Sequence, residues 1–310
     1  MYLPELNTLT AVCVLVGEEG RLRKKYWKKE LRSKENMNRT LILLIGSLVT
    51  FSTCKTGENA IATKITPGND PNFTIVAHTD AGFRATNRKV EVFGIPIYAY
   101  ADVEDSKLLH AANLMAQYLD NDEDGTVDNS MVIDALISNN AALFMWKSES
   151  QINLDAQDLG ADESIPSWHS NGHTGEFDAA VEEVLHVITH SGYASAYPTI
   201  FGENAGTSLT DAMDIARGGH YTKTPKRYPS NAWYTYDDRT CEYDCMATEY
   251  IYWALTSMLG AQENRQSEIA QEWDLITNTL VQKTDTAIYL LLTDPQYMFP
   301  TVLPDGTYKQ

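Results

Sequence analysis

Two histidines and two carboxylates occupy one short stretch of the chain. Glu182, Glu183, His186 and His190 fall, at about 100° per residue, within one wedge of an α-helix whose other positions are mostly apolar. Two imidazoles four residues apart can reach a single metal ion. The stretch therefore predicts a mostly buried helix with a metal-binding stripe. The alternative is a buried histidine pair within a carboxylate network.

The sequence around these histidines resembles the active-site helix of the zincins, metallopeptidases whose motif reads HExxH. Val184–Gly192 has the apolar lead-in of that helix and a glycine soon after the second histidine. The resemblance implies a zincin-like domain in which both histidines bind zinc. Val187 stands where the family has the glutamate that activates the metal-bound water, and valine cannot accept a proton. Hydrolysis then needs a general base at another position of the helix, and Glu183 or Glu182 is expected to be that base.

The resemblance, which is to the zincins with a glutamate ligand, also implies a third zinc ligand on a later helix. Glu249 is a lone carboxylate within an apolar and aromatic stretch, and a buried charge needs a partner or a metal. It is the expected ligand. His169, His173 and His220 remain open as alternatives for this position. Two imidazoles and one carboxylate suit Zn²⁺ and leave a fourth position for water.

A second metal is indicated by a run of aspartates upstream. Asp120, Asp122, Asp124 and Asp128 occupy positions 1, 3, 5 and 9 of a loop with glycine at position 6, which is the spacing of an EF-hand-type calcium loop. Met131 stands at position 12 in place of the glutamate that closes the calcium shell, so the resemblance to the EF-hand is partial. We expect a structural Ca²⁺ ion that joins the flanking helices. The alternative is a solvated acidic turn.

The charge of the chain restricts its partners. The 42 Asp and Glu residues outnumber the 24 Lys and Arg residues, which gives a formal net charge of −18. Such a chain repels the phosphates of nucleic acids and the headgroups of anionic lipids, and it attracts divalent cations. We therefore expect no nucleic-acid partner, and contact with a membrane only through a lipid anchor.

The N-terminal segment is interpreted as an export signal whose true start is Met37. Residues 38–49 then supply a short basic region and an apolar stretch of signal-peptide length, which is too short to span a bilayer comfortably. Small residues directly before Cys54 resemble a bacterial lipobox, which implies an acylated Cys54 and a lipoprotein anchored at the cell envelope. The alternative is an ordinary secretory signal and a secreted protein. We assign residues 1–53 to the leader and residues 54–72 to a flexible tether.

Residues 73–310 are predicted to form a single α+β domain, with a small N-terminal β-sheet followed by a mainly helical part. Alternating patterns predict strands at residues 73–77 and 89–101, the second broken in two at residues 94–96. Apolar residues at helical spacing predict the helices. They are expected at residues 106–118, 130–137, 176–191, 207–217, 245–259, 267–281 and 286–292.

Two cysteines lie within this domain, Cys241 and Cys245. Export of the chain favours a disulfide between them. A four-residue spacing within a helix strains such a bond, so pairing requires a loop at this point. Two cysteines alone do not make a structural zinc site.

These features predict an exported, calcium-stabilised metal-binding protein with a zincin-like site that acts as a zinc-dependent hydrolase. The alternative is a non-catalytic lipoprotein that binds a peptide, a glycan or a metal on the same scaffold. Val187 favours the alternative, because the base of the family is missing. The polar wedge favours a working site, because stability alone would place apolar residues there.

Overall fold

The computed structural model describes residue 68 and residues 70–310. The predicted leader, Cys54 and most of the predicted tether lie outside the described residues. None of the helices in the described part of the chain combines the length and the apolar character needed to span a lipid bilayer.

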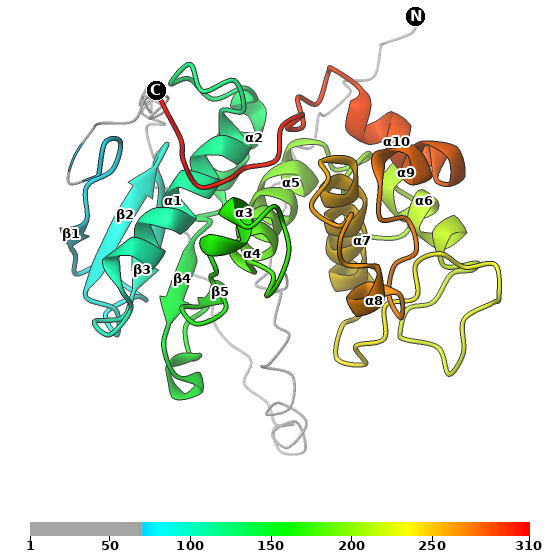
Figure 1. The fold of residues 1–310 in the computed structure, drawn as a ribbon, viewed down its shortest axis with the longest axis horizontal. Coiled ribbons are helices and arrows are strands. Elements are labelled where there is room, and N and C mark those ends of the chain that lie inside the picture. The colour runs from blue at the N-terminus through cyan, green and yellow to red at the C-terminus, as the bar shows by residue number, and fades with distance from the viewer. Residues whose placement is uncertain (1–67, 69) are drawn as a thin grey trace, which may run out of the picture.

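Five short strands form a mixed sheet at one end of the molecule, in the spatial order in which they occur along the chain (Figure 1). They are β1 (Val76–Ala77), β2 (Arg88–Val92), β3 (Ile95–Ala99), β4 (Leu143–Trp146) and β5 (Gln157–Gly160). The first three strands pair antiparallel, and β4 and β5 extend the sheet in parallel. Phe93 and Gly94 form the β2–β3 turn with φ of 48° and 86°, as a two-residue hairpin turn with two positive φ angles requires.

This sheet differs from the predicted one at both edges. Only Val76–Ala77 of the predicted strand over residues 73–77 pairs with β2. The sequence pattern predicts neither β4 nor β5. Every residue of β4 is buried, so the strand lacks alternating polar residues, and a four-residue apolar run does not distinguish a strand from a helix.

Two helices lie between β3 and β4, and the sequence predicts both of them. They are α1 (Asp105–Leu119) and α2 (Ser130–Ser138). α1 packs against β2 and β3 and buries its apolar face there. α2 begins where the Asn129 side chain accepts hydrogen bonds from the amides of Met131 and Val132, which satisfies two of the unpaired amides of a helix start.

A continuous helical segment crosses the middle of the molecule (Figure 1). It consists of α4 (Ala180–His186), the π-helix η4 (Val187–Tyr193) and α5 (Ala194–Ala196). The prediction of one α-helix over residues 176–191 is therefore wrong in its start, in its end and in the change of winding at Val187. The Thr189 hydroxyl donates to the Leu185 carbonyl at 3.0 Å, a contact of the kind that competes with the regular backbone ladder and bends helices.

The C-terminal helices pack around α7 (Tyr243–Met258), away from the sheet (Figure 1). Every residue from Met246 to Ser257 is buried, because α4, α6, α9 and α10 all contact α7. The remaining helices are α3 (Ser167–Ser170), α6 (Ser208–Ala216), α8 (Gln266–Ile269), α9 (Asn278–Thr284), α10 (Thr286–Thr293) and the 3₁₀ turn η3 (Glu149–Gln151). The described residues thus form an α+β fold, as the sequence predicts.

The predicted helix over residues 267–281 is wrong. The chain forms the short α8 and α9 there, and the intervening segment buries Trp273 completely. The Trp273 indole donates to Ser257 Oγ at 2.9 Å and to the Leu275 carbonyl at 2.9 Å. A buried indole needs an acceptor, and a continuous helix would use the Leu275 carbonyl for its own backbone hydrogen bonds.

The two cysteines of the domain form a disulfide. The Cα atoms of Cys241 and Cys245 lie 5.3 Å apart. Cys241 lies in the irregular segment before α7 and Cys245 in the first helical turn, so the start of the helix provides the break in regular structure that this pairing needs.

Gly192 tests the packing of the central segment on α2. A Cβ atom at this position would lie 2.8 Å from Val132 Cγ1 and 3.1 Å from Leu136 Cγ. We expect Gly192→Val to lower the free energy of unfolding by about 1–3 kcal/mol, because overpacking displaces both neighbours. Urea unfolding measures this, with Ser191→Ala as the control on the same helical segment. Equal midpoints for Gly192→Val and the wild type would show that η4 does not pack closely on α2.

Candidate metal centre

His186 lies in the interior between carboxylates from two helices. His186 is the last residue of α4, and Tyr252 of α7 contacts its ring edge-on. Glu183 Oε2 lies 3.5 Å from Nδ1, and Glu249 Oε2 lies 3.7 Å from Nε2. His186 and Glu249 are each 2% exposed. The structure therefore brings together the first histidine of the predicted zinc site and its expected carboxylate partner from α7.

The carboxylates around His186 control its charge. Burial by itself lowers the pKa of the imidazole, but the negative charges of Glu249, Glu183 and Glu182 outweigh that effect and raise the pKa above its ordinary value. The site thus favours positive charge at this ring, carried either by a proton or by a bound cation.

Glu182 and Glu183 approach the same imidazole from within α4. Each of these two residues and His186 offers a ligand atom, and the three atoms lie within 4.8 Å of one another. Glu183 also accepts a hydrogen bond of 2.5 Å from Gln157 Nε2 of β5. That contact holds Glu183 on the Nδ1 side of the ring, opposite Glu249. The carboxylates therefore face two different edges of one imidazole.

The second histidine of the predicted pair lies in a different environment. His190 Nδ1 forms a hydrogen bond of 2.7 Å with Glu203 Oε2, and Thr248 donates to Glu203 Oε1 at 2.6 Å. Among the described residues, His190 belongs to no group of three metal-ligating side chains whose ligand atoms lie within 4.8 Å of one another. His190 lies on the π-helix η4, and its ring is held by Glu203 instead of by the carboxylates around His186.

Glu203 is a residue of this region that the sequence analysis missed. It lies in the loop before α6, where no periodic pattern indicates its direction. Thr248 likewise gives no signal, although it directly precedes Glu249. Both orient His190 only because α7 passes next to η4 in the fold.

The three alternative histidines do not complete the His186 site. His220 pairs with Asp214 at 2.7 Å, and its side chain is 49% exposed. His169 pairs with Asp178 at 2.9 Å. The ring of His173 stacks on Trp168. None of these histidines shares a metal-ligating group with His186 among the described residues.

Three of the four predicted calcium ligands converge. Ligand atoms of Asp120, Asp122 and Asp128 lie within 4.8 Å of one another. Asp124 lies outside this group and accepts the amide of Thr126 at 2.8 Å. Gly125 has φ of 87°, so position 6 of the loop has the backbone conformation for which the sequence places a glycine.

The central aspartate of this loop is held by the backbone and by the end of the chain. Asp120 accepts the amides of Asp124 at 3.1 Å and of Gly125 at 2.8 Å, and the hydroxyl of Tyr308. Burial raises the pKa of Asp120, and a hydrogen bond with Asp122 adds to the effect. Burial also raises the pKa of Asp128, with the three neighbouring aspartates as further causes. Negative charge is therefore crowded in the loop.

Comparison of the chain with known protein families, with curated proteins and with solved structures finds no match.

Proposed function

We propose that the protein binds a zinc ion through His186 Nε2 and Glu249 and that this ion supports hydrolysis. The observation that carries the proposal is the position of His186 Nε2, which is buried without a hydrogen-bond partner among the described residues and faces Glu249 Oε2 at 3.7 Å. On the other side of the ring, Nδ1 faces Glu183 at 3.5 Å. Histidines that bind metals commonly donate their second ring N–H to a carboxylate, which leaves the other nitrogen for the metal.

The distance between the two ligand atoms suits one ion. Ligands about 2.0–2.2 Å from a tetrahedral Zn²⁺ lie about 3.4 Å from each other, and His186 Nε2 and Glu249 Oε2 lie 3.7 Å apart. Glu182 lies with Glu183 and His186 in a group of ligand atoms within 4.8 Å of one another, and among the described residues Glu249 belongs to no such group of three. His186 and Glu249 are therefore the two protein ligands in this proposal. Glu183 then orients the imidazole of His186. It does not act as the general base that the sequence predicts at this position.

A non-catalytic metal site is the second candidate. It is supported by Val187 at the position of the missing base and by the deep burial of His186 and Glu249. Structural zinc sites are closed to solvent, whereas catalytic sites keep a position for water. In both candidates the chain is an exported protein, anchored by a lipid on Cys54 or secreted.

Zinc content tests the site directly. We expect His186→Ala and Glu249→Gln to weaken zinc binding at this centre at least tenfold, seen as the loss of one equivalent of bound zinc, since each removes one proposed ligand. His220→Ala is the matched control, because His220 is a half-exposed histidine outside the site, and it should bind zinc as the wild type does. Isothermal titration and metal analysis after dialysis measure the effect. Wild-type affinity in both His186→Ala and Glu249→Gln would contradict the proposal. Hydrolysis of a peptide and ester library, with and without chelator, then separates the two candidates.

The aspartate loop is proposed to bind a structural Ca²⁺ ion. Asp120, Asp122 and Asp128 supply converging oxygens, the ligands that calcium prefers. We expect calcium to raise the melting temperature of the wild type, and Asp122→Ala to abolish that increase. Asp134→Ala is the control, because Asp134 is an exposed aspartate on α2. An equal calcium response in Asp122→Ala and Asp134→Ala would show that the loop is only an acidic turn.

The stabilisation by calcium should depend on pH. The folded-state pKa values of Asp120 and Asp128 are raised, so without calcium their ionisation lowers stability at neutral pH. The loss of stability becomes smaller as the pH falls toward about 4, the ordinary carboxyl pKa. In that range the folded state binds protons more readily than the unfolded state. Calcium should therefore raise the melting temperature more at pH 7.5 than at pH 5. A larger increase at pH 5, measured by differential scanning fluorimetry, would contradict this.

A further inference from the structure

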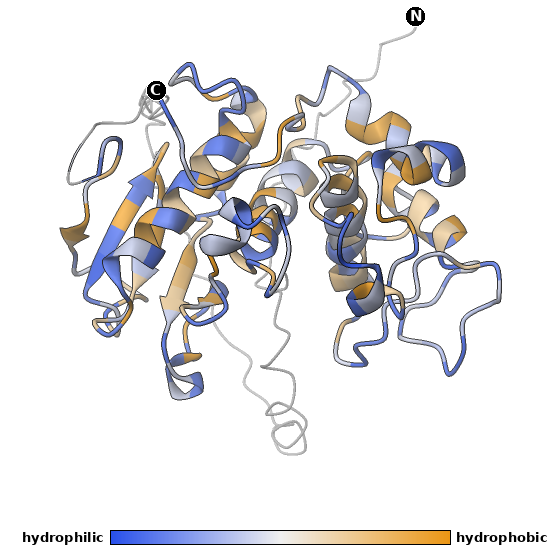
Figure 2. Cartoon of the chain, in the orientation of Figure 1, coloured by the Kyte–Doolittle hydropathy of each residue, from blue (hydrophilic) through white to orange (hydrophobic). Residues whose placement is uncertain are grey.

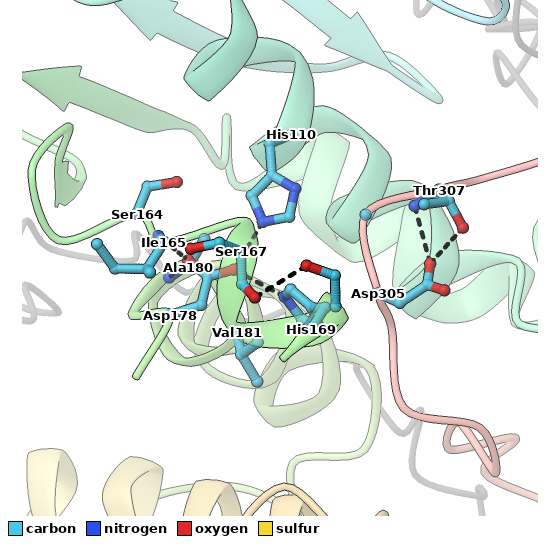
Figure 3. A network of polar contacts seen from close by, with 12 residues as sticks. His110, Ser164, Ile165, Ser167, His169, Asp178, Ala180, Val181, Asp305 and Thr307 are labelled. Atoms are coloured by element: carbon cyan, nitrogen blue, oxygen red, sulfur yellow. Dashed lines mark hydrogen bonds and ion pairs between the residues drawn. The ribbon is translucent and has the colours of Figure 1, made fainter. Parts of the chain in front are cut away.

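Two histidines and an aspartate meet in the interior at a place that the proposed function does not use (Figure 3). His110 of α1 and His169 of α3 both direct Nε2 at the same oxygen, Asp178 Oδ2, at 2.6 Å and 2.9 Å. Asp178 lies just before α4 and is 0% exposed. The side chains of His110 and His169 are 7% and 6% exposed. Three residues that are distant in the sequence thus form one buried cluster, here named the His–Asp–His cluster.

The backbone holds Asp178 in place for this contact. Its Oδ1 accepts the amides of Ile165 at 2.8 Å and of Ala180 at 3.3 Å. These two bonds leave Oδ2 to the imidazoles (Figure 3). A carboxylate oriented by backbone donors, with two nitrogens directed at its second oxygen, is a preorganised set of ligand atoms.

The cluster also carries buried negative charge. Asp178 is 0% exposed, and its carboxylate oxygens face two imidazoles and backbone amides, with no Lys or Arg among these partners. A buried carboxylate without a cationic partner is costly. A cation within the cluster would compensate it.

We propose that His110, His169 and Asp178 form a second site for a divalent transition metal, with Zn²⁺ as the preferred ion. Two imidazole nitrogens and one carboxylate oxygen are a common ligand set for zinc and for non-haem iron, whereas calcium takes oxygen ligands only. The three ligand atoms lie within 4.8 Å of one another. Ligands of a tetrahedral zinc lie about 3.4 Å apart, so the contacts of 2.6 Å and 2.9 Å need to widen by about 0.8 Å and about 0.5 Å.

Metal binding at Nε2 has a defined proton balance. In the metal-free cluster Nε2 of each neutral ring donates its hydrogen to Asp178, and in the metal-bound cluster each ring carries that hydrogen on Nδ1. The rings therefore change tautomer without a change in net charge. His169 Nδ1 is buried without a hydrogen-bond partner among the described residues, so no existing bond is lost there.

The C-terminal segment covers one edge of the cluster. A Cβ atom on Gly306 would lie 2.2 Å from His110 Nδ1, so the backbone of residue 306 passes directly over this ring. Gln117 of α1 fixes the segment by accepting the amides of Asp305 at 2.9 Å and Gly306 at 2.8 Å. This segment therefore covers the Nδ1 edge of His110, whereas the Nε2 atom of the ring faces Asp178.

The site is independent of the proposed centre at His186, because the two share no residue. The test accordingly uses the full chain in a His186→Ala background, which lacks the first centre. We expect this protein to retain one equivalent of Co²⁺ after dialysis, with the absorption spectrum of cobalt bound by nitrogen and oxygen. Adding His169→Ala should remove that equivalent. Adding His173→Ala should not, because His173 lies next to His169 but outside the cluster.

X-ray absorption at the cobalt edge gives a second measurement that needs no variant of the cluster, and we expect two imidazoles and an oxygen donor. Absence of bound cobalt in His186→Ala, or its retention in the folded His186→Ala/His169→Ala protein, would overturn the second site. Loss of one equivalent on going from the wild type to His186→Ala reports separately on the first centre.

Discussion

Glu183 and Glu249 face the two nitrogens of one buried imidazole, and this arrangement ties α4 to α7. Buried charges need compensation, so the two helices must stay at the separation that keeps His186 between the carboxylates. α4 also contacts α1 and β5, whereas α7 contacts the C-terminal helices. The polar contact at His186 therefore lies where the sheet half and the helical half of the molecule meet. Figure 2 shows hydrophilic and hydrophobic residues interspersed along the ribbons of both halves.

The two histidines of the central helical segment have different partners, although they lie only one helical turn apart. His186 remains among the carboxylates of α4 and α7. His190 instead binds Glu203, which is held by Thr248. The imidazole of His186 is the one proposed to bind a metal. The ring of His190 is oriented by Glu203 and is less buried. π-helical turns within α-helices occur frequently at functional sites, which agrees with a functional role for this segment.

The last residues of the chain connect the calcium loop to the His–Asp–His cluster. Tyr308 donates to Asp120, the amide of Lys309 donates to Glu123, and Gln117 binds the segment that covers His110. Asp120 is both a proposed calcium ligand and the acceptor of Tyr308. The conformation of the aspartate loop and the covering of His110 therefore depend on the same C-terminal residues. The two proposed ions would nevertheless have different ligands.

Local sequence patterns were sufficient for features that depend on neighbours along the chain. The helices α1 and α2, the glycine turn within the aspartate loop and the burial of the segment around His186 follow from periodicity and residue type, because these are short-range properties. The association of His186 with Glu249 was also predicted, but from a resemblance. The interrupted helix around Trp273 was predicted incorrectly, because a tertiary hydrogen bond of the indole outweighed helical periodicity.

The tertiary structure alone decided which polar groups share a site. His110 lies within an apolar helix and Asp178 just before another, so neither carries a local signal, and they meet His169 only because α1, α3 and the start of α4 pack together. The pairing of His190 with Glu203, and not with the carboxylates around His186, is likewise set by contacts in space. Ligand convergence is a property of distances in space, and a single sequence contains only the spacing along the chain.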